Sequence, residues 1–130
     1  MKITTFDPVI ITPKAESAVS LFEALGFEIT HSPTAKPKGV SMTVFRMKHE
    51  NGFHVDIIDN KDIPKDITTI RMNVNDFDEA HDILTANGFS ELYPDAPHDS
   101  PTHIGSEMIS PTGLTITLMQ HIKKEEMQQG

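Results

Sequence analysis

The pattern of apolar and polar positions along the chain occurs twice. Residues 17–27 read as an amphipathic helix that ends at a glycine and continues into a strand. The same pattern returns in residues 79–89. The matched positions are Ala18 with Ala80, Leu21–Phe22 with Ile83–Leu84, Ala24 with Ala86, Gly26 with Gly88 and Phe27 with Phe89. One structural unit is therefore predicted to be present in two copies.

The first copy predicts one helix and four strands. The β-branched stretch Ile3–Thr12 predicts a buried strand. A helix follows to about Leu25, with Thr12 as its cap and Pro13 at its first position. Asn51-Gly52 predicts a hairpin turn because both residues tolerate positive φ. The remaining predicted strands of this copy are Phe27–His31, Ser41–Lys48 and Phe53–Asp59, and Ser32–Gly39 is predicted to be a loop.

The second copy predicts the same order of elements. Asp76, with Glu79 three residues later, predicts the capped start of a helix that ends at Gly88. A loop with three prolines, Pro94–Thr102, lies at the same place in the repeat as the first proline-rich loop. The predicted strands are Thr68–Val74, Phe89–Tyr93, His103–Ile109 and Leu114–His121.

These elements predict an α+β fold of two paired βαβββ modules. The modules occupy residues 1–60 and 66–121 of one domain, and residues 122–130 form a polar tail. Each module has a helix for only one face of its strands, so the other face must be covered or must line a cavity. We therefore expect one curved mixed sheet around a cleft, with the helices outside.

Composition restricts the partners of such a domain. The net charge is −8, which argues against nucleic acid and would attract a cationic ligand. The absence of cysteine excludes disulfides and thiolate sites. No apolar run approaches the ~20 residues of a membrane helix, and the first residues lack an apolar signal core. We therefore expect a cytoplasmic protein without membrane or nucleic-acid partners.

Three stretches resemble one known family. They are Ala18–Glu28, Gly52–Ile58 and Gly113–Gln120. Together they resemble the vicinal oxygen chelate superfamily, which includes glyoxalase I, bleomycin- and fosfomycin-resistance proteins and extradiol dioxygenases. The resemblance covers about residues 3–121. It implies the paired βαβββ modules that the pattern predicts independently, and it implies a homodimer.

The resemblance also implies positions for metal ligands. Metal-binding members of the family carry His or another ligand near the start of each module's first strand, and Glu in each last strand. The corresponding residues here are Asp7 and Thr69, then Asp56 and Thr117. Threonine hydroxyls are poor ligands for transition metals, and two carboxylates would hold only a hard ion such as Mg²⁺, and weakly. We therefore expect no metal and no other cofactor.

The same positions define the expected cleft. Strand alternation places Asp56 on one face with His54 and Ile58. Asp56 could act as a general base, bind a cation, or simply face a wet groove. His54 could relay a proton to it, or be an ordinary surface histidine.

Two further residues complete the predicted cleft. Arg71 shares a face with Thr69 and could bind an anion, or could pair with one of the cleft carboxylates. Phe45 could line an apolar pocket.

Three functions remain open from the sequence. The first is metal-independent binding of a small molecule in the cleft between the modules. The second is a lyase or isomerase of the glyoxalase type with Asp56 as base. The third is a structural or regulatory dimer module that has lost the site.

Overall fold

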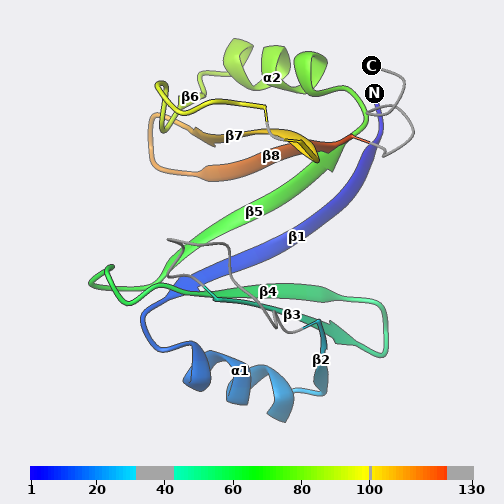
Figure 1. The fold of residues 1–130 in the computed structure, drawn as a ribbon, viewed down its shortest axis with the longest axis vertical. Helices are drawn as coiled ribbons and strands as arrows, with labels where there is room; N and C mark the ends of the chain where they lie inside the picture. The colour runs from blue at the N-terminus through cyan, green and yellow to red at the C-terminus, as the bar shows by residue number, and fades with distance from the viewer. Residues whose placement is uncertain (32–42, 100, 123–130) are drawn as a thin grey trace. The chain divides into compact units, whose positions relative to one another are not determined.

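The computed structural model describes residues 1–31, 43–99 and 101–122. It contains eight strands and two helices (Figure 1). In chain order the elements are β1 (Ile3–Thr12), α1 (Ala15–Ala24), β2 (Phe27–His31), β3 (Thr43–His49), β4 (His54–Asp59), β5 (Ile67–Val74), α2 (Phe77–Ala86), β6 (Ser90–Glu91), β7 (His103–Ile109) and β8 (Thr115–His121). The predicted pair of βαβββ modules is confirmed. Neither helix within these ranges is long and apolar enough to cross a membrane.

The chain forms two compact units. The first unit comprises Asp7–Thr69, and the second comprises Met1–Phe6 with the described residues from Ile70 onward. Strands β1 and β5 therefore each contribute residues to both units. The predicted cleft between the modules stays a prediction.

In the first unit the strand order is β2-β3-β4-β1. Strand β4 pairs in parallel with β1 and antiparallel with β3. Helix α1 lies along one face, and Val55 and Ile57 on β4 belong to the same buried cluster as Ala15 of that helix. The buried core consists of Ala15, Met47, Val55 and Ile57, with Ile10, Ala18, Val19, Phe22, Phe27 and Phe45 packed against it.

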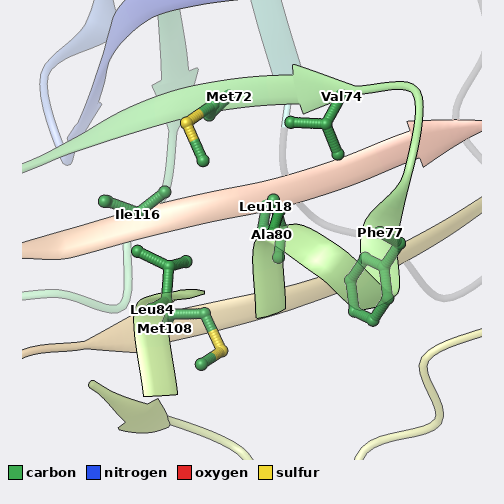
Figure 2. Close-up of a cluster of buried hydrophobic side chains, with 8 residues drawn as sticks. All are labelled: Met72, Val74, Phe77, Ala80, Leu84, Met108, Ile116 and Leu118. Atoms are coloured by element: carbon green, nitrogen blue, oxygen red, sulfur yellow. The ribbon is translucent and has the colours of Figure 1, made fainter. Parts of the chain in front are cut away.

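In the second unit the order is β5-β8-β7-β6, with β5 and β8 parallel and the other pairs antiparallel. Helix α2 covers one face. Figure 2 shows side chains from β5, β7 and β8 meeting those of α2. The buried core consists of Met72, Val74, Phe77, Ala80, Leu84, Met108, Ile116 and Leu118.

Four glycines end the helices or turn the hairpins. Their φ angles are positive, at +101° for Gly26, +98° for Gly52, +94° for Gly88 and +104° for Gly113. The two helix stops and the two hairpin glycines thus occupy equivalent places in the repeat, as the sequence predicts. This region of φ is costly for residues with a Cβ atom, so the repeated glycines are a conformational requirement.

The two helices start differently. Asp76 caps α2, since its side chain accepts a hydrogen bond of 3.1 Å from the Glu79 amide. The prediction that Thr12 caps the first helix is wrong. Helix α1 has Lys14 at its N-cap with φ at −129°, and the Thr12 hydroxyl instead accepts a bond of 3.1 Å from the Lys14 amide. The helix begins later than predicted because the backbone of Lys14, with ψ at 64°, is not yet helical.

One predicted strand is much shorter in the structure. Only Ser90–Glu91 of the predicted Phe89–Tyr93 strand is regular, because the chain turns directly afterwards and the Ala96 amide bonds the Tyr93 carbonyl at 3.0 Å. The other strands agree with prediction to within two residues at each end. The predicted loop at 32–39 and the tail from 123 lie outside the described residues.

Candidate functional site

Two buried carboxylates lie on the helix-free face of the first unit. Asp7 is 5% exposed and Asp56 is 4% exposed. Val9 is the partner of Asp56 in the parallel β1–β4 register, and Asp7 lies two residues before Val9 on the same side of β1. The two carboxylates are therefore diagonal neighbours across adjacent strands. This adjacency is what a shared role for Asp7 and Asp56 requires.

Cations flank these carboxylates on β3. Arg46 lies directly opposite Asp56, and Lys48 lies opposite His54. His54 is exposed, whereas Asp56 is buried. Thr69 is also buried in this unit, at 4% exposure. Glu28 of β2 in turn lies opposite Lys48, so this polar face of the first unit carries both carboxylates and cations around Asp56.

Phe45 does not belong to that face. It lies opposite Ile57 in the β3–β4 register and packs against the core under α1. Cross-strand partners point to the same side of a sheet, so Phe45 points toward the helix and away from Asp56. The predicted place of Phe45 in a cleft lining is corrected accordingly.

The second unit carries a polar row across three strands. Arg71 on β5 is the partner of Thr117 on β8, and Thr117 is the partner of Glu107 on β7. The Thr117 hydroxyl donates a hydrogen bond of 2.8 Å to Oε2 of Glu107. All three alternate with residues of the α2-facing core, so they lie on the helix-free face.

Glu107 has a perturbed acidity. Burial raises the pKa of its carboxyl group above the ordinary value, and the hydrogen bond from Thr117 opposes that shift without cancelling it. A carboxyl group whose pKa is moved toward neutrality is suited to carry and exchange a proton. Glu107 is thus a chemically distinctive residue that the sequence prediction did not include.

A pocket of about 230 Å³ opens beside Glu107. Its floor includes Gly105, Glu107, Thr117 and Met119, and its wall comes from residues 93–99. Tyr93 lines the pocket and is 61% exposed. A Cβ atom at position 105 would lie 3.3 Å from the Leu118 carbonyl oxygen, so glycine keeps this part of the floor open.

Backbone hydrogen bonds hold the wall to β7. The Leu92 amide bonds the Glu107 carbonyl at 2.8 Å, and the Gly105 amide bonds the His98 carbonyl at 2.8 Å. Asp99 and Ile104 form an antiparallel bridge. The wall therefore follows the strand that carries Glu107.

A second polar cluster joins the wall to the rest of the unit. The Glu91 carboxylate accepts hydrogen bonds from Nε2 of His98 and, at 2.9 Å, from the Ser106 hydroxyl. His81 on α2 places its Nε2 atom 4.0 Å from the same carboxylate. Burial pushes the pKa of Glu91 upward, but the bonds from Ser106 and His98 and the charges of both imidazoles outweigh it, so this pKa lies below its ordinary value.

A larger hollow of about 580 Å³ lies beside α1 in the first unit. Its lining includes Ile10, Leu21 and Phe22, with Lys14 and Lys65 among its charged residues. Leu21 is 55% exposed, and neither carboxylate of the helix-free face contributes to this hollow. The pocket beside Glu107 is smaller, yet it is lined by a carboxyl group of altered acidity, so we treat it as the candidate site.

The residues at the family's ligand positions do not fit a transition metal. They are Asp7, Asp56, Thr69 and Thr117, and the Thr117 hydroxyl is engaged by Glu107. No imidazole is among them, although imidazole and carboxylate are the usual ligands of Zn²⁺ and Ni²⁺. Across the described ranges, no three His, Asp or Glu side chains are grouped as metal ligands.

Solved structures of other proteins share this fold. No protein-family model matches the chain, and no curated protein matches it by sequence. Solved structures do match. Methylmalonyl-CoA epimerase from Mycobacterium tuberculosis is 14% identical, with 95% of this chain and 91% of that chain covered and a TM-score of 0.66. A protein from Staphylococcus aureus is 19% identical, with 92% and 98% covered and a TM-score of 0.64.

A glyoxalase I variant from Zea mays is 16% identical, with a TM-score of 0.67. The match covers 92% of this chain but only 43% of the maize chain. Glyoxalase I and methylmalonyl-CoA epimerase are both members of the vicinal oxygen chelate superfamily. At these identities the similarity establishes the fold, and it confirms the fold that the sequence resemblance implies.

Proposed function

We propose that the protein binds a small organic molecule in the pocket beside Glu107, without a transition metal. The observation that carries this proposal is the pairing of a partly buried carboxyl group with the Thr117 hydroxyl inside a pocket of about 230 Å³. Ligand sites combine an enclosed surface with a few well-placed polar groups. The pocket lies on the helix-free face, which must either be covered or line a cavity.

The lining indicates the chemistry of the ligand. Glu107 and Asp99 offer acceptors for a cationic or hydrogen-bond-donating group, and Tyr93 offers an aromatic face to a planar or cationic one. Structural neighbours support small-molecule binding, since one methylmalonyl-CoA epimerase was solved with methylmalonyl-CoA and another with 2-nitronate-propionyl-CoA. The ligand panel should therefore include cations, planar aromatic compounds and acyl-CoA thioesters.

Thermal-shift measurement with this panel tests the proposal. We expect at least one compound to raise the melting temperature of the wild-type protein, and we expect Glu107→Gln to lose that response. Glu23→Gln, which makes the same chemical change on exposed α1, is the matched control and should keep it. A panel that stabilises neither the wild type nor the control would count heavily against ligand binding.

A second candidate function is proton transfer, as in an isomerase or lyase of the glyoxalase type. The raised pKa of Glu107 favours it, because a general acid–base works best with a pKa near the working pH. Asp56, the base predicted from the sequence, is the alternative to Glu107. It is buried and lies beside Asp7. Two assays apply: hemithioacetal isomerisation with and without added Ni²⁺ or Zn²⁺, and exchange of the α-proton of an acyl-CoA thioester in D₂O.

Matched variants separate the two bases. If Glu107 transfers the proton, Glu107→Gln removes exchange while Asp56→Asn keeps it, and the reverse pattern assigns the base to Asp56. No turnover in either assay would leave binding as the function. The dimer expected from the family resemblance is part of the same proposal, and light scattering after size-exclusion chromatography measures it.

A further inference from the structure

His98 connects the pocket to a cluster on the other side of its wall. It lines the pocket, and its Nε2 atom donates to the Glu91 carboxylate. Ser106 also lines the pocket and donates to the same carboxylate oxygen, at 2.9 Å. Glu91 therefore joins a residue of the wall to a residue of β7.

Two aromatic rings of helix α2 contact the His98 ring. The centroid of the Phe77 ring lies 5.7 Å from that of His98, and the His81 ring lies 6.1 Å from it. Phe77 is itself 5% exposed and belongs to the core of the second unit. The His98 ring is thus held between a carboxylate and an aromatic residue that is fixed in the core.

The charges around His98 come from several elements. His81 faces it from α2 and Glu91 from β6, while Ser106 on β7 is polar but does not titrate. On the pocket side, Asp99, His103 and Glu107 share the lining with it. Of these groups, Glu91 is the one that accepts a hydrogen bond from His98.

We propose that His98 is a positioning residue: by bonding Glu91 it holds residues 93–99 in place as the wall of the pocket. This role rests on the proposed function, because a fixed wall has a purpose only where the pocket takes a ligand. Loss of the bond would free the wall while leaving the core of the second unit intact.

Hydrogen exchange of the free protein tests the position of the wall without any ligand. The Ala96 amide, bonded to the Tyr93 carbonyl, and the Gly105 amide, bonded to the His98 carbonyl, report on the wall. We expect His98→Ala and Glu91→Ala, each of which removes one partner of the bond, to speed their exchange by roughly tenfold or more, since a hydrogen bond to a charged group typically contributes that much. Amides of β8, in the core of the same unit, should be unchanged.

A conservative variant distinguishes the loss of the hydrogen bond from the loss of side-chain volume at position 98. In His98→Gln the side-chain amide can donate to Glu91 from about the place of Nε2, so protection at Ala96 and Gly105 should return.

The outcomes separate this role from ligand binding. Unchanged exchange at Ala96 and Gly105 in both His98→Ala and Glu91→Ala would overturn the role of His98, as would equal acceleration of the β8 amides. Faster exchange confined to the wall would support it, even if the panel of cations, aromatics and thioesters stabilised nothing. Faster exchange of the wall together with no stabilising compound would overturn the proposed function and leave the role of His98 standing.

Discussion

The hydroxyl group of Thr117 donates a hydrogen bond of 2.8 Å to the carboxylate of Glu107. Burial favours the neutral form of Glu107, and this bond favours the charged form. The two residues are register partners on adjacent antiparallel strands, so the bond is a consequence of how β7 and β8 pair. The acidity of Glu107 is therefore set by burial and opposed by one hydroxyl group, which the pairing of the β7–β8 hairpin holds in place.

Glu107→Gln should change how stability depends on pH. The unfolded chain releases this proton near the ordinary value of 4.5, and the folded protein releases it at higher pH. Between these two values the folded state holds more proton, so the free energy of unfolding contributed by Glu107 is full below pH 4.5 and falls as pH rises. Urea unfolding from about pH 4 to about pH 8 should show the wild type losing stability relative to Glu107→Gln.

A second substitution checks the cause of that difference. Thr117→Val removes the bond that lowers the pKa of Glu107, so the loss of stability should extend to higher pH. Carboxyl titration by NMR would measure the shift directly. A pKa for Glu107 that is lower in Thr117→Val than in the wild type would contradict the assignment of the bond.

Three glycines with positive φ should respond differently to alanine. At Gly52 nothing lies within 4 Å of an added Cβ, so Gly52→Ala measures only the backbone cost, about 1–2 kcal/mol. At Gly88 the nearest atoms belong to Pro111 at 3.6 Å, an ordinary contact. At Gly26 the Cβ would lie 3.1 Å from Nε2 of His49. Chemical denaturation should rank Gly26→Ala as the most destabilising, and equal losses at all three would refute the steric part of this account.

The starts of the two helices provide another matched pair. Asp76→Ala removes the side-chain cap of α2 and should lower the free energy of unfolding by about 1 kcal/mol. Lys14→Ala changes the N-cap residue of α1, whose side chain makes no capping bond, and should stay within about 0.5 kcal/mol. Denaturant titration of the two variants decides between them. Equal losses would mean that the Asp76 bond contributes nothing.

Much of the fold could be predicted because local chemistry determines it. The glycines at 26 and 88 end the helices, and those at 52 and 113 turn the hairpins. Alternation alone placed Asp56 opposite the core, and the structure buries Val55 and Ile57 under α1 as expected. The start of α1 was misplaced because Thr12 and Lys14 are both compatible with the residues before the helix, and only the backbone angle distinguishes them.

The candidate site was harder to predict because it depends on pairing between strands. Glu107 lies within the strand predicted at His103–Ile109, and a charge in the middle of a strand is the signal that drew attention to Asp56. Comparison of equivalent positions in the two modules also points to Glu107. Asp56 matches Thr117, and their register partners are Arg46 and Glu107, so the two modules place opposite charges at equivalent positions. The contact of His98 with Glu91 has no counterpart in sequence spacing.

The most direct test of ligand binding uses the chain's single tyrosine. The protein has one Tyr and no Trp, and Tyr93 lines the pocket, so intrinsic fluorescence reports on this site alone. We expect a compound from the cation, aromatic and thioester panel to change the Tyr93 emission saturably in the wild type and in Glu23→Gln, and to leave Glu107→Gln unchanged. A saturable change of equal affinity in Glu107→Gln, or none in the wild type with any of these compounds, would contradict the account.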